Sequence, residues 1–513
     1  MKKRTASNNN GKEKLMTAYT LKQDHLDAIS EHISIPKYQR RQLKTGIVHI
    51  GIGDFHRGHQ AYYTDQLLHD TSITDWGICG VALLPSDIKI YKALKKQDSL
   101  YTLMVKEFDG ALTKRVIGSI TEVLFAPENP SKVIKKMASS AVKIITLTIT
   151  ERGYNYNEVN KAFDAQNPDI RHDIANPLMP KTVFGYLTQA LKLRKEKGAN
   201  GVTIQSCDNI HRNGHMAKNM LLSYVRLAEP SLVSWIETHV SFPNSMVDRI
   251  TPTTTASDIA ILKATTGIKD ACPVVCEPFK QWVIEDDFVN GRPLWDAVAA
   301  RFVEDIVPYE KMKLSLLNAG HTVLGILGAL LGYKTIDEAV HDEDLCTFLE
   351  QYMDHEVSPT LSDLKGVDLE HYKASLLQRF GNVSIKDQID RVCSESTSKI
   401  PIYVLPTITA NLESKGQIEC AALLIAAFAI YSLGKDEKGK SLNIKDTMEV
   451  TLRKKAAQAA NGQPEAFLEI EPVFGLLKSS PSFVSAYTKA YNTLRTSGIK
   501  TCIKTYTNNR INC

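Results

Sequence analysis

Residues 47–53 read IVHIGIG, an apolar and β-branched run that ends in glycines. The run is typical of a buried strand, and residues 57–70 after it carry apolar side chains at helical spacing. Further strands and helices alternate along the next 150 residues, with strand patterns at 76–84, 142–150 and 202–209 and helical patterns at 86–97 and 182–197. Strands that are apolar along their whole length and separated by helices indicate a parallel sheet covered on both faces. The first half is therefore predicted to be α/β and doubly wound.

The second half of the chain has a different pattern. After about residue 290, β-branched runs become rare, and helical patterns cover 310–332, 345–357, 420–434 and 482–495. We expect the boundary near GRPLW (291–295). The predicted organisation is a disordered basic tail over 1–16, an α/β domain over 17–290 and a mainly α-helical domain over 291–513.

Composition excludes several classes of protein. Of 513 residues, 43% are hydrophobic and 23% are charged, which is close to the globular average. The net charge is +5, and residues 1–15 carry +4 of it, so the remainder is nearly neutral. A nearly neutral body argues against a nucleic-acid-binding protein, which usually has a basic face. The longest apolar run, 420–431, is shorter than the roughly 20 residues of a membrane span and predicts a buried helix.

The cysteines do not form a recognisable framework. There are nine, scattered and without a CxxC pair, which favours reduced thiols in a cytoplasmic protein. Cys272 and Cys276 lack partners at the spacing of a metal site, so no metal is predicted. The N-terminus has no apolar segment after its basic residues, so we do not expect a secretory signal.

The glycines after the first strand have two interpretations. Gly51 and Gly53 stand where a Rossmann turn brings its backbone against a pyrophosphate, but the third glycine, Gly58, comes two residues later than in G-x-G-x-x-G. An ordinary tight turn has the same appearance. Asp87, after the second strand, fits the acidic residue that binds the adenosine ribose, or alternatively the N-cap of the helix 88–97.

The apolar helix 310–332 carries three polar residues. At about 100° per residue, Asn318 lies about 140° and His321 about 80° around the helix from Lys313, so the three can share one broad face. Burial lowers the pKa of a lysine, as a general base requires. Individually, Lys313 can extend to solvent from the helix start, Asn318 can bond locally, and His321 can be a satisfied core histidine.

Polar residues also follow the later strands, at the edge where doubly wound sheets bind ligands. They are Glu151 after the third strand and the pair Asp208 and Asn209 after the fourth. The stretch 242–254 adds Asp248 and Arg249, although an isolated loop aspartate is usually solvated or capping.

Several motifs, in this order, resemble one known family. They are GIGDFHRGHQAYYTDQL (51–67), TLTITERGY (146–154), SCDNIHRNG (206–214), FPNSMVDRITP (242–252), VVCEPFKQWVIEDDFVNGRP (274–293), KMKLSLLNAGH (311–321) and DRVCSESTSKIP (390–401). Together they resemble the polyol-specific long-chain dehydrogenases, from about residue 40 to the end. The resemblance implies a Rossmann-type N-terminal domain, a mainly α-helical C-terminal domain and an active site between them. It implies a monomeric oxidoreductase that uses NAD and no zinc and acts on a small polyol or ketose, typically D-mannitol and D-fructose.

The resemblance also implies roles for individual residues. Lys313 would take the alcohol proton, Asn209 and Asn318 would hydrogen-bond the reacting oxygen, and Glu151 would relay the proton to solvent. His321 would line the substrate site together with four charged residues, Asp248, Arg391, Lys399 and Glu310. The cofactor-binding residues would be Gly51, Gly53, Phe55, His56, Arg57 and Asp87. The family often has a second acidic residue before the last of these, but here it is Ser86, which leaves NAD preferred with some NADP use.

Other functions remain open from the sequence. A sorbitol, D-arabinitol or hexuronate such as fructuronate fits the same residues, and an anionic substrate would use a basic pocket that Arg391 and Lys399 can supply. A non-catalytic NAD-binding scaffold would keep the fold and lose the chemistry. The presence of Lys313, Asn318 and Asn209 disfavours the scaffold.

Overall fold

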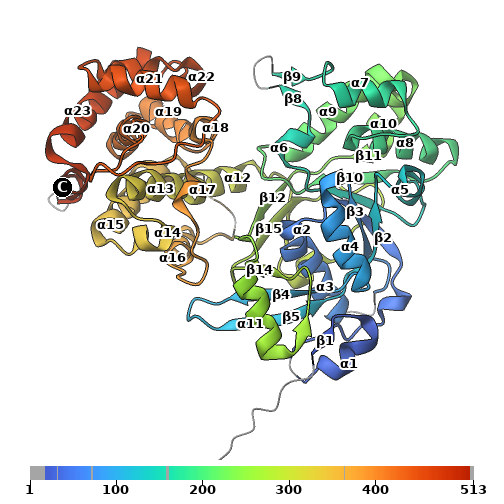
Figure 1. Cartoon of the computed structure of the whole chain (residues 1–513). Helices are drawn as coiled ribbons and strands as arrows, with labels where there is room; N and C mark the ends of the chain where they lie inside the picture. The colour runs from blue at the N-terminus through green and yellow to red at the C-terminus, as the bar shows by residue number, and fades with distance from the viewer. Residues whose placement is uncertain are drawn as a thin grey trace, which may run out of the picture. The chain divides into compact units, whose positions relative to one another are not determined.

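The computed structural model describes residues 18–31, 33–70, 73–157, 161–362, 364 and 366–508. The chain forms two compact units (Figure 1). Of the described residues, the first contains those within 18–105, 112–276 and 280–302, and the second contains those within 106–111, 277–279 and 303–508. The tail predicted at 1–16 lies outside the described residues. The division after residue 302 falls within the strand β16 (Arg301–Val303), whose other two residues lie in the first unit.

A six-stranded parallel sheet forms the centre of the first unit. Its strands, in spatial order, are β11 (Val240–Ser241), β10 (Val202–Ser206), β7 (Ile144–Leu147), β2 (Thr45–Ile50), β3 (Gly77–Ala82) and β6 (Ile120–Phe125). Every neighbouring pair is parallel. This is the strand order of the Rossmann fold, with β2 first in sequence and central in space. The predicted doubly wound α/β fold is confirmed.

Helices cover both faces of this sheet because side chains alternate along each strand. Val48 and Ile50 of β2 face one hydrophobic cluster, and Ile47 faces another. The first cluster includes buried residues of α5 (Pro130–Met137), α8 (Val183–Glu196), α9 (Asn213–Ala228) and α10 (Val233–His239). The second includes residues of α3 (Gln60–Asp70) and α4 (Ile88–Lys96).

Smaller sheets complete the first unit. They are β12 (Ser245–Asp248), β15 (Gln281–Glu285) and β16; β14 (Val274–Cys276), β4 (Tyr101–Lys106) and β5 (Leu112–Ile117); β1 (Tyr19–Thr20) with β13 (Ile268–Lys269); and β8 (Tyr156–Asn157) with β9 (Ala162–Phe163). The helices α1 (Leu26–Ile29), α7 (Pro168–Ala175) and α11 (Ala256–Thr266) lie outside the central sheet.

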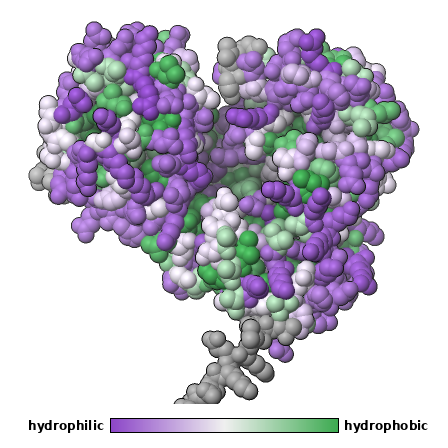
Figure 2. All heavy atoms as spheres, viewed as in Figure 1, coloured by the Kyte–Doolittle hydropathy of each residue, from purple (hydrophilic) through white to green (hydrophobic). Residues whose placement is uncertain are grey.

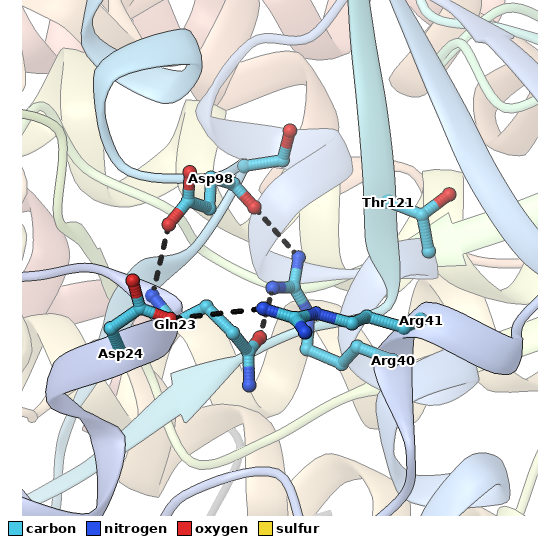
Figure 3. A pocket seen from close by; sticks show the side chains of 7 residues that line it. Gln23, Asp24, Arg40, Arg41, Asp98 and Thr121 are labelled. Carbon is cyan, nitrogen blue, oxygen red and sulfur yellow. Dashed lines mark hydrogen bonds and ion pairs between the residues drawn. The ribbon is translucent and has the colours of Figure 1, made fainter.

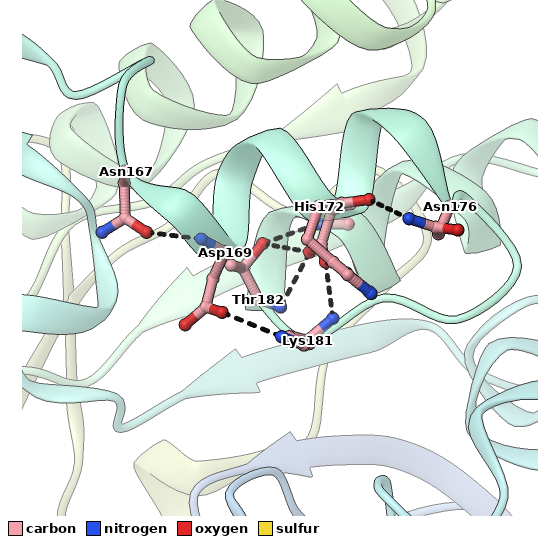
Figure 4. A network of polar contacts seen from close by, with 8 residues as sticks. Asn167, Asp169, His172, Asn176, Lys181 and Thr182 are labelled. Atoms are coloured by element: carbon pink, nitrogen blue, oxygen red, sulfur yellow. Dashed lines mark hydrogen bonds and ion pairs between the residues drawn. The ribbon is translucent and has the colours of Figure 1, made fainter.

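A buried aspartate joins α7 to the start of α8. The Asp173 carboxylate accepts hydrogen bonds from the backbone N–H groups of Lys181 and Thr182, each at 2.8 Å, and from the Thr182 hydroxyl at 2.7 Å. The exposed pair Lys181 and Asp169 lies beside this network, with His172 (Figure 4). A buried carboxylate that accepts this many hydrogen bonds fixes the loop between the two helices.

The second unit is helical in its described residues. Its helices are α12 (Val307–Lys313), α13 (Ala319–Leu331), α14 (Ile336–Val340), α15 (Glu343–Gln351), α16 (Leu369–Phe380), α17 (Ile389–Val392), α18 (Ser396–Tyr403), α19 (Leu405–Ser414), α20 (Glu419–Tyr431), α21 (Glu449–Ala460), α22 (Glu471–Phe474), α23 (Pro481–Ser497) and α24 (Ile499–Asn508). The predicted mainly helical second half is confirmed.

Two apolar helices, α13 and α20, form the core of this unit. Almost every residue of α20 is buried, as predicted for the run 420–431. The buried carboxylate of Glu356 accepts hydrogen bonds from the N–H groups of Cys420 and Ala421 and so caps the first turn of α20. Of the described residues, only the helical stretch 307–331 is long and apolar enough to cross a membrane, and 78% of its most apolar window is buried inside the protein.

A buried ion pair explains why residues 277–279 belong to the second unit. The Glu277 carboxylate accepts two hydrogen bonds from the Arg379 guanidinium, at 2.8 and 3.0 Å, and both side chains are 0% exposed. The guanidinium also lies 4.0 Å from the ring centre of Phe279. The two hydrogen bonds offset the cost of taking both charges out of water.

On the viewed face, the surface is mainly hydrophilic with scattered hydrophobic residues (Figure 2).

Candidate functional site

The turn after β2 uses its two glycines differently. Gly51 has φ +101°, and a Cβ at this position would lie 2.0 Å from the Thr148 carbonyl oxygen. Only glycine fits there. Gly53 has φ −67°, and no described atom lies within 4 Å of the position that a Cβ would take. The fold therefore requires glycine at position 51 but not at position 53.

This turn stands at the point where the order of the sheet reverses. β2 lies between β3 and β7. From β2 the chain continues to β3 and β6 on one side of β2, and then crosses to β7, β10 and β11 on the other side. The Thr148 hydroxyl, just after β7, donates to the Gly51 carbonyl at 2.7 Å, so the two strand ends are joined. Doubly wound sheets bind nucleotides at this switch point.

Two stacked histidines lie behind the turn. The rings of His49 and His56 are 3.4 Å apart and nearly parallel. Burial lowers the pKa of His49 to about 3 and holds the pKa of His56 well below its usual value. Both rings are therefore neutral near pH 7. His56, a predicted cofactor residue, is buried within the protein and brings no positive charge to the turn.

Arg57, also predicted to bind cofactor, is directed inward as well. Its guanidinium is 3% exposed and donates to the carbonyl oxygens of Ile52 and Cys272 and to the Asp54 carboxylate. These bonds fix the helix α2 (Asp54–Gly58) against the strand region that contains Cys272. Phe55 packs at the edge of the core beside α3.

Asp87 lies where the sequence predicts an acidic residue. It follows β3, the neighbour of β2, so it shares the carboxyl edge of the sheet with the glycine turn. Its carboxylate accepts a hydrogen bond from the Leu84 N–H at 2.9 Å. It forms no side-chain cap on α4, although its backbone stands at the N-cap position. The side chain is half-buried and one carboxylate oxygen is bonded to the loop.

Asp208 joins the loops after β7 and β10. Its buried carboxylate accepts hydrogen bonds from the N–H groups of Ile149 and Thr150, at 3.1 and 2.9 Å, and from the Tyr154 hydroxyl at 2.8 Å. Burial, together with the nearby charge of Glu151, raises the pKa of Asp208 to about 6 even though these hydrogen bonds act to lower it. The predicted residues Glu151 and Asn209 are exposed on either side of this aspartate.

Asp248 is the last residue of β12, Arg249 comes directly after it, and both are buried. The Arg249 guanidinium donates to the Gly58 carbonyl oxygen at 2.7 Å and lies 4.8 Å from the ring centre of Tyr62. Asp248 lies close enough to the buried His59 to raise its pKa, although burial dominates and lowers that pKa to about 3. The structure therefore connects this strand to the helices that follow the glycine turn.

The second unit carries the lysine on a continuous helix with an altered pitch. α12 and α13 are joined by the π-helical turn η6 (Leu314–Asn318), in which the Ala319 N–H bonds the carbonyl of Leu314, five residues earlier. The angles predicted for an unbroken α-helix are therefore wrong here. The wider π turn turns through a smaller angle per residue than an α-helix, so Lys313 and Asn318 lie closer to one face than predicted.

Lys313 and Asn318 both fit a site for a polar ligand. Lys313 is 6% exposed, and Glu310, one turn earlier, is also buried. The Oδ1 atom of Asn318 is buried and has no hydrogen-bond partner among the residues that the structure describes. Because buried polar atoms are normally bonded, this oxygen marks a place that a ligand atom or a water would fill. π turns are frequent at functional sites.

One turn further along, His321 meets a carboxylate that the sequence did not single out. Asp387 is buried, accepts two hydrogen bonds from Arg391, and lies 3.8 Å from His321 Nε2. The spacing of four residues between Asp387 and Arg391 is the only signal in the sequence. Lys399 donates to the Val392 carbonyl at 2.9 Å, and burial, aided by the charge of Arg391, lowers its pKa.

A pocket of about 390 Å³ lies elsewhere on the first unit (Figure 3). Arg40 and Asp98 line it, and the Arg40 guanidinium is already bonded to the carbonyls of Gly118, Asp98 and Ile120 and to Gln23. Thr121 places it at the amino end of β6, away from the edge with the glycine turn. Among the described residues, no group of three His, Cys, Asp or Glu side chains is arranged to hold a metal ion.

Most of the predicted residues thus form two sets, and the exceptions are Asp248 on β12 and Phe55, His56 and Arg57 of α2. In the first unit, Gly51, Gly53, Asp87, Glu151 and Asn209 share the carboxyl edge of the parallel sheet. In the second unit, one set lies on and beside the helix 307–331 and comprises Glu310, Lys313, Asn318, His321, Arg391 and Lys399.

Comparisons with known proteins cover nearly the whole chain. A family model described as the mannitol dehydrogenase Rossmann domain matches residues 45–297, and one described as the mannitol dehydrogenase C-terminal domain matches 305–495. A mannitol 2-dehydrogenase of Neosartorya fischeri is 42% identical over 481 residues, which is 92% of this chain and 95% of that protein.

Two solved structures are similar over the same length. The ternary complex of Pseudomonas fluorescens mannitol 2-dehydrogenase with NAD and D-mannitol is 42% identical, has a TM-score of 0.85, and is matched over 95% of this chain and 99% of that one. A substrate-free D-sorbitol dehydrogenase is 36% identical, with a TM-score of 0.88 over 94% of this chain and 100% of that one.

Proposed function

Because the chain belongs to the mannitol dehydrogenase family, we propose that it is an NAD-dependent polyol dehydrogenase that interconverts D-mannitol and D-fructose. The observation that carries the proposal is the match, over 95% of the chain, to an enzyme solved with NAD and D-mannitol.

The glycine turn fits the cofactor. The open side of Gly53 leaves room for a pyrophosphate to approach the backbone, and Gly51 sets the direction of the turn. The Asp87 carboxylate has the right place to accept hydrogen bonds from the ribose hydroxyls, and its charge opposes a 2′-phosphate. Arg57 and His56 act by holding the turn in shape. When bound, NAD accepts the hydride that leaves the alcohol carbon.

Lys313 acts as the general base in this proposal. Its amine takes the hydroxyl proton as the carbon–hydrogen bond breaks, and the resulting ammonium stabilises the developing negative charge on oxygen. The amide groups of Asn318 and Asn209 donate hydrogen bonds to the same oxygen. These groups polarise the oxygen without a metal ion. Glu151, exposed beside Asp208, passes the proton to solvent.

The remaining residues bind hydroxyl groups of the substrate. His321, Arg391 and Lys399 offer donors, and Asp248 and Glu310 offer acceptors. A polyol needs both kinds because each hydroxyl is at once a donor and an acceptor. The match to a D-sorbitol dehydrogenase keeps D-sorbitol as a second candidate substrate, since the two sugar alcohols differ in configuration at one carbon.

A panel of substrates tests the proposed function. D-Mannitol, D-sorbitol and D-arabinitol are oxidised with NAD, and D-fructose and D-fructuronate are reduced with NADH. The expected result is the highest kcat/KM for D-mannitol and D-fructose. A protein that binds NADH but turns over none of these substrates would be the non-catalytic scaffold instead.

Replacement of Asp87 with alanine is expected to shift cofactor use toward NADP. Loss of the carboxylate removes a hydrogen-bond acceptor for the ribose and the repulsion of a 2′-phosphate, so the NADP-to-NAD ratio of kcat/KM should rise at least about tenfold. Steady-state kinetics with both cofactors measures it. Ser86→Ala, at the exposed neighbouring position, serves as the control. An unchanged ratio in Asp87→Ala would contradict the role of Asp87.

A further inference from the structure

Asp387 occupies a fixed place beside two of the substrate-binding residues. It is 8% exposed, and its carboxylate oxygens accept hydrogen bonds from Arg391 Nε at 2.8 Å and Nη2 at 2.5 Å. The second oxygen is also 3.8 Å from His321 Nε2. One carboxylate therefore lies against both Arg391 and His321.

The backbone holds this aspartate in position. The Ile336 N–H donates to the Asp387 carbonyl at 2.9 Å, and the Ile389 N–H donates to the Lys334 carbonyl at 3.0 Å. Thr335 and Gln388 form an antiparallel bridge between these two bonds. These bonds hold the backbone of residues 387–389 against the start of α14, so the Cα of Asp387 has a fixed place and Arg391 orients on the carboxylate that it carries.

The pairing changes what Arg391 offers to a ligand. Its side chain is 65% exposed, but the fork formed by Nε and Nη2, which matches a carboxylate best, already holds Asp387. A guanidinium has five N–H donors, so those that remain can bond the oxygen of a hydroxyl group. The charges of Asp387 and Arg391 also cancel. An arginine bound in this way suits a neutral polyol and not an anion.

The other lysine of the region does not restore a positive site. Lys399 Nζ donates to the Val392 carbonyl, and burial disfavours its charged form. Glu395, at the N-cap of α18, lies close enough to Lys399 to add negative charge beside it. The positive and negative charges around Arg391 are thus balanced. This differs from the basic pocket that Arg391 and Lys399 could supply when judged from the sequence alone.

We propose that Asp387 determines substrate specificity: by holding the fork of Arg391 and orienting it beside His321, it restricts the enzyme to uncharged polyols and ketoses and rejects their carboxylated analogues. This proposal rests on the proposed function. Asp387 acts through Arg391 and His321, so it is a positioning residue and does not itself take part in the hydride or proton transfer.

The test compares D-fructose with D-fructuronate, which carries a carboxylate at its sixth carbon, in the wild type and Asp387→Asn. The variant keeps the shape and one acceptor but loses the charge. The expected result is a rise of about ten- to a hundredfold in the ratio of kcat/KM for fructuronate to that for fructose, mostly through KM. The gain should shrink in 0.5 M salt, because screening weakens attraction between exposed charges.

Matched variants separate charge from structure. Asp390→Asn removes the same charge from an exposed position three residues away and should leave the ratio unchanged. Adding Arg391→Met to Asp387→Asn should abolish the gain. A variant that loses activity equally on both substrates, or keeps the wild-type ratio, would overturn the proposal.

An alternative variant and the activity of the wild type separate failure of this proposal from failure of the proposed function. If Asp387→Asn does not fold, Arg391→Gln in an otherwise wild-type chain replaces it, because the uncompensated Asp387 should then lower fructuronate reduction more than fructose reduction, and an equal loss overturns the proposal. A wild type without activity on fructose contradicts the proposed function, whereas an active wild type with an unresponsive ratio contradicts only the role of Asp387.

Discussion

Replacing Lys313 with alanine is expected to lower kcat for mannitol oxidation about a thousandfold with little change in the fold. A general base contributes roughly 10²–10⁴-fold to a rate, and the amine of Lys313 also supplies the positive charge nearest the developing alkoxide in the proposed reaction. The side chain is 6% exposed at the end of α12. Its truncation removes the base and leaves the apolar face of the helix in place.

The measurement combines NADH formation with thermal unfolding and NADH binding. Lys311→Ala is the matched control, because Lys311 lies on the same helix and its amine bonds the carbonyl of Thr360. The control should keep nearly full activity. Addition of a small primary amine should partly restore turnover in Lys313→Ala, which a purely structural role would not permit. Near-normal kcat in Lys313→Ala would falsify the assignment of the base.

The helix that carries Lys313 shows what an apolar pattern can and cannot predict. Its extent follows from the long apolar run, because burial stabilises such a helix wherever the run continues. Its pitch does not follow, since one extra residue per turn depends on the packing around residues 314–318 and not on their hydrophobicity. The sequence therefore found Lys313 and Asn318 on one helix but misjudged the angle between them.

The same distinction holds for the sheet. β2, β3, β7 and β10 were predictable because strands buried on both faces must be apolar throughout. The edge strand β11 has only two residues, and β6 contains Thr121 and Glu122 among its apolar residues, so neither gave a clear pattern. The side chains of an edge strand are less completely buried, so they need not be apolar throughout. Which strand an edge strand pairs with depends on the tertiary structure.

Residues that position others were also hidden from the sequence. Asp387 and Asp208 bond groups that are close in space only after folding: His321 is 66 residues from the first, and Thr150 is 58 residues from the second. An isolated aspartate in a loop is most often solvated or capping. The partners that give these carboxylates their roles come from the tertiary structure.

Gly51→Ala and Gly53→Ala are expected to fail in different ways, and the difference decides between a cofactor turn and an ordinary tight turn. Alanine at position 51 would meet the Thr148 carbonyl at 2.0 Å with φ +101°, so we expect the free energy of unfolding to fall by about 3 kcal/mol or more. Alanine at position 53 has an ordinary φ and open space, so its stability should change by less than about 1 kcal/mol. Chemical denaturation measures both.

Gly53→Ala, the variant with little effect on stability, is the one expected to weaken the binding of NADH. If the open side of Gly53 receives the pyrophosphate, a methyl group there occupies the space that the cofactor needs, and Kd for NADH should rise about ten- to a hundredfold in a protein as stable as the wild type. Gly110→Ala, in the hairpin between β4 and β5, also has open space around its Cβ position but has φ +84°, so it is the control for backbone strain and should lower stability without changing Kd for NADH. Fluorescence titration with NADH gives Kd for each variant. Equal affinities of Gly53→Ala and the wild type would show that the glycine at 53 serves only the turn, because a backbone that a pyrophosphate touches cannot accept a side chain at no cost.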